Sequence, residues 1–88
     1  MKMSFLLPAS VTQANAVQLE RDGLLSLTTS GLIDCSGLQD FDSTVLTVLI
    51  SWQKNLQARG LNLQMTGAPE KLTVLASVYG VSALLGLS

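Results

Sequence analysis

Three carboxylates stand close together near the middle of the chain and are its clearest candidates for chemistry. Asp34, Asp40 and Asp42 follow a short apolar segment that predicts a strand. Because α/β proteins place their sites at the carboxyl ends of strands, these side chains could bind Mg²⁺ there. We favour the structural alternative, in which Asp42 begins a helix, Asp40 lies in a solvated loop and Asp34 accepts hydrogen bonds from loop amides.

The single cysteine, Cys35, is the other reactive side chain in this region. A thiol needs a neighbouring base to become a nucleophile, and the chain contains no histidine. The lack of histidine also excludes His-based acid–base catalysis, catalytic triads and most zinc sites. Without a base to activate it, Cys35 is predicted to be a buried core residue. The sequence also lacks a P-loop and a G-x-G-x-x-G motif, so we expect no cofactor, and we expect no metal.

The composition points to one small domain that binds a protein partner. The chain has 88 residues, of which 48% are hydrophobic and 12% are charged, with a net charge of −1. This length supplies one core over residues 1–88, and the low charge excludes disorder. Five Lys and Arg cannot form the basic face of a nucleic-acid binder. The excess of apolar residues predicts that part of the surface meets a partner.

The elements that position these residues alternate between strands and helices. We expect a strand over 2–7 and a turn over 8–10. A helix should follow from Thr12 to about Asp22, with Gly23 as its end. Residues 24–29 should form a strand or lead into one, residues 31–36 a buried strand and residues 37–41 a loop. Ser10 with Gln13 offers a rival start for the first helix. Strands that alternate with helices favour a mostly parallel sheet.

The longest helix is predicted over residues 42–59, with Asp42 or Ser43 as its cap and Gly60 as its end. Its apolar side holds Val45, Leu49, Trp52 and Leu56, flanked by Leu46 and Val48, and its opposite side holds Ser43, Thr44, Thr47, Ser51 and Lys54. Solvated helix faces usually carry several charges, whereas this one carries a single Lys. The hydroxyl side therefore predicts a docking surface, with an ordinary polar face as the alternative.

The last part of the chain predicts a strand over 61–66 and a helix that starts at Pro69 and ends at Gly80. Residues 72–88 carry no charge and reach a marginal membrane-spanning length. We expect a buried helix with a short apolar tail instead, because glycines and hydroxyls interrupt the run. The first ten residues lack the apolar region of a signal peptide, which predicts a cytoplasmic protein.

Three segments resemble the STAS domain family of sulfate transporters and anti-sigma-factor antagonists. They are Leu32-Ile33-Asp34-Cys35-Ser36-Gly37-Leu38, Phe41-Asp42-Ser43-Thr44 and the ending Leu75-Ala76-Ser77-Val78-Tyr79-Gly80-Val81. The resemblance covers residues 4–86 and implies an α/β fold, a single STAS-like domain with a small, mostly parallel (mixed) sheet and three helices. Two features depart from the family pattern: one short strand ahead of the first helix instead of two, and Val45 where a small residue is expected.

The ending over residues 75–81 looks like that of the small STAS subunit of the Mla phospholipid-transport ABC complex. This implies a non-enzymatic, cytoplasmic accessory subunit that binds the transporter's ATPase and meets the inner membrane only through that complex, in a system of outer-membrane lipid asymmetry. On this reading the partner-binding residues are Asp42, Ser43, Thr44 and Thr47, joined by Gln39 and Phe41 on the preceding loop. Ile50 lies at the border of the hydroxyl side on the helical wheel, where we expect either an apolar contact with the partner or burial in the core. One alternative is an anti-sigma-factor antagonist that is regulated by phosphorylation of Ser43, and another is an enzyme built on the aspartates.

Overall fold

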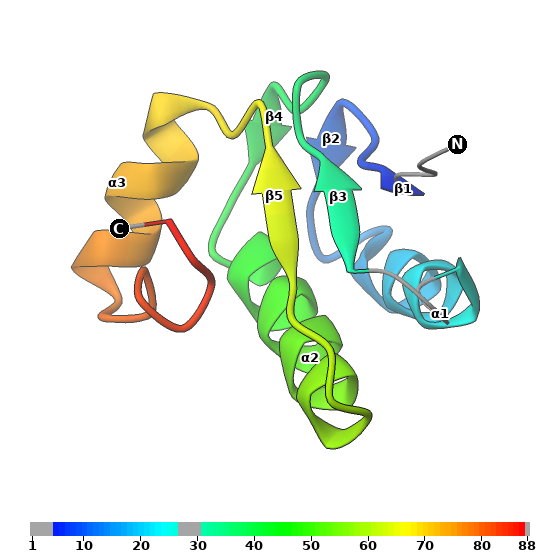
Figure 1. Cartoon of the computed structure of the whole chain (residues 1–88). Coiled ribbons are helices and arrows are strands. Elements are labelled where there is room, and N and C mark those ends of the chain that lie inside the picture. The colour runs from blue at the N-terminus through cyan, green and yellow to red at the C-terminus, as the bar shows by residue number, and fades with distance from the viewer. Residues whose placement is uncertain (1–4, 27–30, 88) are drawn as a thin grey trace.

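A computed structural model of the chain describes residues 5–26 and 31–87 (Figure 1). The elements are β1 (Phe5–Leu6), β2 (Ser10–Val11), α1 (Ala16–Ser26), β3 (Leu32–Asp34), β4 (Asp40–Phe41), α2 (Thr44–Ala58), β5 (Gln64–Thr66) and α3 (Glu70–Val78). Figure 1 shows α1 and α2 side by side, with α3 at the far edge of the sheet beyond β5. The expected α/β class and the three helices are confirmed.

The strands form two small parallel sheets, one with the order β1-β3-β5 and the other made of β2 and β4. The second sheet continues the first, because the segment that links β1 to β2 stays hydrogen-bonded to the segment that links β3 to β4. The Leu7 amide donates to the Asp34 carbonyl at 3.0 Å, and the amides of Gln39 and Asp40 both donate to the Ala9 carbonyl at 2.8 Å. The prediction of a loop over 37–41 is therefore wrong for Asp40 and Phe41, which form β4.

The start of the chain also differs from the single strand that was expected there. Residues 8–10 were assigned to a turn, but Ser10 begins β2, so two strands precede α1. Pro8 has no amide hydrogen to donate, and it separates the two strands. The first helix is therefore preceded by two strands, as in the family pattern.

Helix α1 has the expected length but lies four residues later in the chain than expected. Thr12 starts a turn in which its hydroxyl accepts from the Ala14 amide and its carbonyl accepts from the Ala16 amide, and the helix then runs from Ala16 to Ser26. Gly23 does not end it, because Gly23 lies inside the helix and is not among the glycines with positive φ. The strand expected over 24–29 is wrong for 24–26, which are helical, and residues 27–30 lie outside the described ranges.

Helix α2 matches its expected limits, and its apolar side forms the centre of the core. Val45, Leu49, Trp52 and Leu56 are all 0% exposed. The Trp52 indole donates to the Glu20 carbonyl at 3.0 Å and meets the Phe5 ring edge-on, with 5.4 Å between ring centroids. Gly60 ends the helix with a φ of 76°, a conformation that glycine adopts without strain.

The C-terminal region consists of the helix α3 and a tail that is bonded to α2. Pro69 caps α3 from outside rather than starting it, and Gly80 ends α3 with a φ of 72°. Gln53, which is 5% exposed, ties the tail down: its side chain donates to the Leu84 carbonyl at 2.8 Å and accepts from the Leu63 amide at 2.7 Å. None of the helices in the described ranges is long and apolar enough to cross a bilayer.

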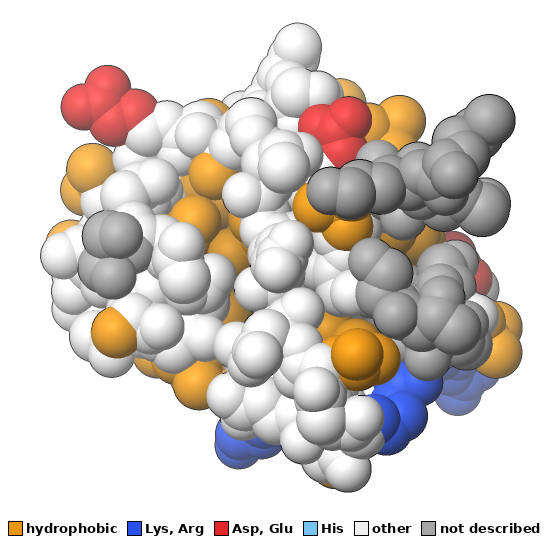
Figure 2. Space-filling model, viewed as in Figure 1, with side chains coloured by type: hydrophobic (Ala, Val, Ile, Leu, Met, Phe, Trp, Pro, Cys, Tyr) orange, Lys and Arg blue, Asp and Glu red, His pale blue; other side chains and the backbone are white. Residues whose placement is uncertain are grey.

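Charged and apolar side chains are unevenly distributed over the surface. Figure 2 shows acidic side chains at the edge where the strands end, and Lys and Arg at the opposite edge. Among residues 5–26 and 31–87, the large apolar side chains that remain exposed are Leu6, Val17, Leu25, Val74, Val78, Tyr79 and Leu84.

Candidate functional site

The aspartates at the ends of the strands hold turns together. The Ser36 amide donates to Asp34 Oδ1 and the Thr44 amide donates to Asp42 Oδ1, both at 2.9 Å. Hydrogen bonds from the side chain and the backbone of Ser36 lower the pKa of Asp34, and those from Thr44 lower the pKa of Asp42 in the same way. In the part of the chain that the structure describes, no three His, Cys, Asp or Glu side chains gather as a metal site.

Cys35 lies in the core at 0% exposure, as expected. Burial raises the pKa of the Cys35 thiol to about 11, and the neighbouring Asp34 charge adds to this effect. The reactive form of a cysteine is the thiolate, so Cys35 is an inert core residue at neutral pH.

The start of α2 combines a capping carboxylate with an exposed hydroxyl. Of the two expected caps, only Asp42 makes a side-chain bond to the start of α2, by accepting from the Thr44 amide. Ser43 occupies the N-cap position but makes no side-chain capping bond, and its side chain is exposed. The Ser43 hydroxyl is therefore not needed to hold the helix.

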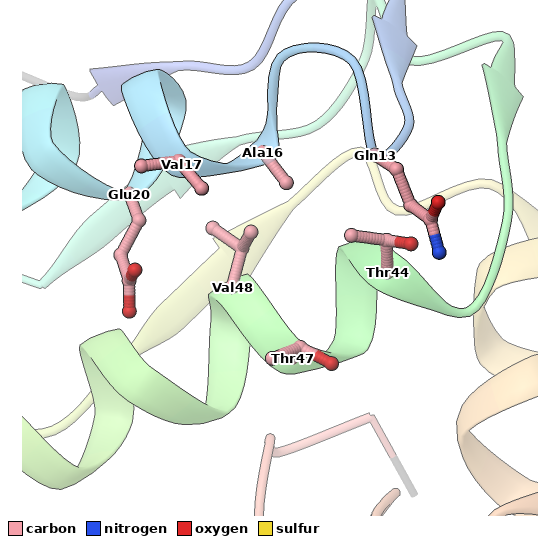
Figure 3. Close-up of a pocket in the computed structure, with 7 residues that line it drawn as sticks. All are labelled: Gln13, Ala16, Val17, Glu20, Thr44, Thr47 and Val48. Carbon is pink, nitrogen blue, oxygen red and sulfur yellow. The ribbon is translucent and has the colours of Figure 1, made fainter.

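A groove opens between α1 and α2 beside this helix start. It measures about 220 Å³ and is lined by Gln13, Ala16, Val17, Glu20, Thr44, Thr47 and Val48 (Figure 3). Its lining includes Thr44 and Thr47 from the expected partner-binding set, which places one edge of the hydroxyl side against an apolar floor. The contribution of α1 was missed, because the sequence gives no signal for which turn of α1 packs beside which turn of α2.

The other expected partner-binding residues do not line this groove, and their side chains are buried to different extents. Gln39 is exposed in the turn before β4, and Ile50 is half-buried against the core. Phe41 is only 6% exposed, and the Lys71 ammonium lies 5.4 Å from the centre of its ring. The Phe41 ring is therefore buried. It would affect a partner only indirectly, by holding β4 in position.

Comparison with known proteins assigns this fold to a family. Residues 7–86 match the family described as Mlab, STAS domain, and the chain therefore belongs to the STAS domain family of this type. No curated protein matches the chain. STAS domains are generally binding modules without enzymatic activity, and the family includes accessory subunits and anti-sigma-factor antagonists.

Proposed function

Because the chain is an Mlab-type STAS domain, we propose that it is an accessory subunit of an ABC transporter that moves phospholipids. In this proposal it binds the transporter's ATPase and supports its assembly or activity. The contact surface is the docking face, which we define as Asp42, Ser43, Thr44 and Thr47 with the adjoining groove. The domain then works in the cytoplasm and reaches the inner membrane only through the transporter.

The observation that carries this proposal is the low cost of removing water from the docking face. Ser43 and Thr47 are exposed, Thr44 is half-buried, and Val17 in the adjoining groove is 65% exposed. Hydroxyls lose less on desolvation than charged groups, and exposed apolar atoms gain when a partner covers them. The charged groups on this face are two carboxylates, that of Asp42 at the start of α2 and that of Glu20 in the groove.

A second function is favoured by one specific feature, the free hydroxyl at the start of α2. In an anti-sigma-factor antagonist a kinase would phosphorylate Ser43, whose side chain is exposed and makes no capping bond. A phosphate at a helix N-terminus is electrostatically favoured. The same phosphate would lie beside Asp42, where like charges repel.

Binding to a purified ATPase tests the first function directly. The domain is mixed with the ATPase subunit of a phospholipid-transporting ABC system from the same organism, and the affinity and the ATP hydrolysis rate are measured. The ATPase of an unrelated ABC importer serves as the control. We expect a stable complex with the first ATPase and none with the second. Equal binding to both, or to neither, would contradict the proposal.

A phosphorylation assay separates the second function from the first. The domain is incubated with ATP and the anti-sigma-factor kinases of the same organism, and Ser43 is analysed by mass spectrometry. A Ser43→Ala variant controls for phosphorylation at other hydroxyls. Stoichiometric phosphate on Ser43 without ATPase binding would favour the antagonist role over the transporter role.

A further inference from the structure

The groove between α1 and α2 has an apolar floor and polar ends. Figure 3 shows Val48 of α2 rising towards Ala16 and Val17 of α1, with Glu20 at one end and Gln13 and Thr44 at the other. Ala16 and Val48 are buried, whereas Val17 is 65% exposed although it faces this floor. A single aliphatic side chain from another molecule would cover Val17 and Val48 together.

The charge at the ends of the groove is negative. The Glu20 carboxylate stands at one end, and Asp42 lies two residues before Thr44 at the other. The next cation along this side of α2 is Lys54, and no ion pair joins Lys54 or any other described Lys or Arg to Glu20. The backbone of Glu20 is held at this point of α1, because its carbonyl accepts the hydrogen bond from the Trp52 indole.

We propose that the groove binds a partner segment in which a large aliphatic side chain stands next to a Lys or Arg. The aliphatic group lies on Val17 and Val48, and the cation pairs with the Glu20 carboxylate. Apolar contact supplies the attraction, and the ion pair selects the segment and its direction. This inference rests on the proposed function only for the identity of the partner, the transporter ATPase.

The first test measures how the affinity for the ATPase depends on charge at Glu20. The variants are Glu20→Gln and Glu20→Lys, and the control is Asp22→Lys, on the same helix at a position whose exposed carboxylate bonds only to Gln18 within the described residues. Glu20→Gln should weaken binding roughly two- to fivefold, as expected for a partly exposed ion pair. Glu20→Lys should weaken it by more than about tenfold, because like charges then face each other.

The second test needs no ATPase. The domain is titrated with n-hexylammonium chloride and, separately, with sodium hexanoate, while NMR follows the methyl groups of Val17 and Val48. The cation should shift these signals in a saturable way and the anion should not. In the Glu20→Gln chain the hexylammonium affinity should fall roughly two- to fivefold.

The two tests fail in distinguishable ways. If the ATPase binds wild type and Glu20→Lys equally, the inference is overturned while the proposed function stands. If the ATPase does not bind at all, the proposed function is overturned, and the hexylammonium titration alone decides the inference. Equal shifts with hexanoate and hexylammonium, or none with either, would overturn the inference whatever the ATPase does.

Discussion

The indole of Trp52 lies directly against the backbone of Gly23, so that a Cβ added at Gly23 would overlap the six-membered ring and Nε1. This contact joins α1 to α2. Alanine normally stabilises a helix by about 1 kcal/mol relative to glycine. Here the overlap opposes that gain, because overpacking a buried contact costs about 1–3 kcal/mol.

We therefore expect Gly23→Ala to lower the free energy of unfolding, by up to about 2 kcal/mol once the helix propensity is subtracted. Chemical denaturation followed by circular dichroism measures this change. The Gly23→Ala/Trp52→Phe double variant is the control, since a smaller ring leaves room for the methyl group and should restore part of the loss. A stabilised Gly23→Ala chain would contradict the contact.

The buried amide of Gln53 should be needed to hold the C-terminal tail. In Gln53→Met the side chain keeps its length, but the Leu63 amide and the Leu84 carbonyl lose their partner. A buried backbone group left without a hydrogen bond costs about 1–3 kcal/mol. We expect a loss of stability in this range and faster hydrogen exchange at Leu63, whereas Gln57→Met at an exposed position of α2 should change neither. Unchanged exchange at Leu63 would show that other contacts protect this amide.

Local signals in the sequence were enough to predict α2 and the ends of two helices. The spacing of Val45, Leu49, Trp52 and Leu56 identified the buried side of α2, and Gly60 marked where it ends. These features depend on residues within a few turns of each other. Gly80, which ends α3, was predicted for the same reason.

Features that depend on contacts distant in the sequence were not predicted. The local pattern interpreted Gly23 as a helix end, because the indole that requires a glycine there comes from another helix. Strand β4 was assigned to a loop because only its pairing with β2 makes it a strand. The groove was missed for the same reason, although its two threonines were identified from the hydroxyl side of α2.

Cys35 should be unreactive in the folded protein. With a pKa of about 11, only about one thiol in 1,000 is ionised at pH 8, and burial further blocks access. Ellman's reagent should therefore label the native chain far more slowly than the chain in denaturant. A Ser36→Cys chain provides the matched control, since the new thiol stands at an exposed position and should react at once. Rapid native labelling of Cys35 would show that this part of the core opens readily.

An acidic residue at position 43 should separate binding from folding. Ser43→Asp places a negative charge at the N-terminus of α2, which the helix dipole favours, so the melting temperature should hardly change. The same charge enters the docking face beside Asp42, and we expect the affinity for the ATPase to fall by about tenfold or more, as for facing like charges. Ser43→Asn controls for side-chain size without the charge. Wild-type affinity in Ser43→Asp would place Ser43 outside the contact.

The most direct test of the docking face is the affinity of the Thr47→Arg variant for the ATPase, measured together with its melting temperature. Thr47 is exposed at the edge of the groove, and an exposed helix position tolerates Arg. Ser77→Arg, at an exposed position of α3, is the matched control. The account predicts that Thr47→Arg keeps the wild-type melting temperature and loses binding by more than about tenfold, while Ser77→Arg binds normally. A folded Thr47→Arg chain that binds the ATPase as tightly as wild type would contradict it.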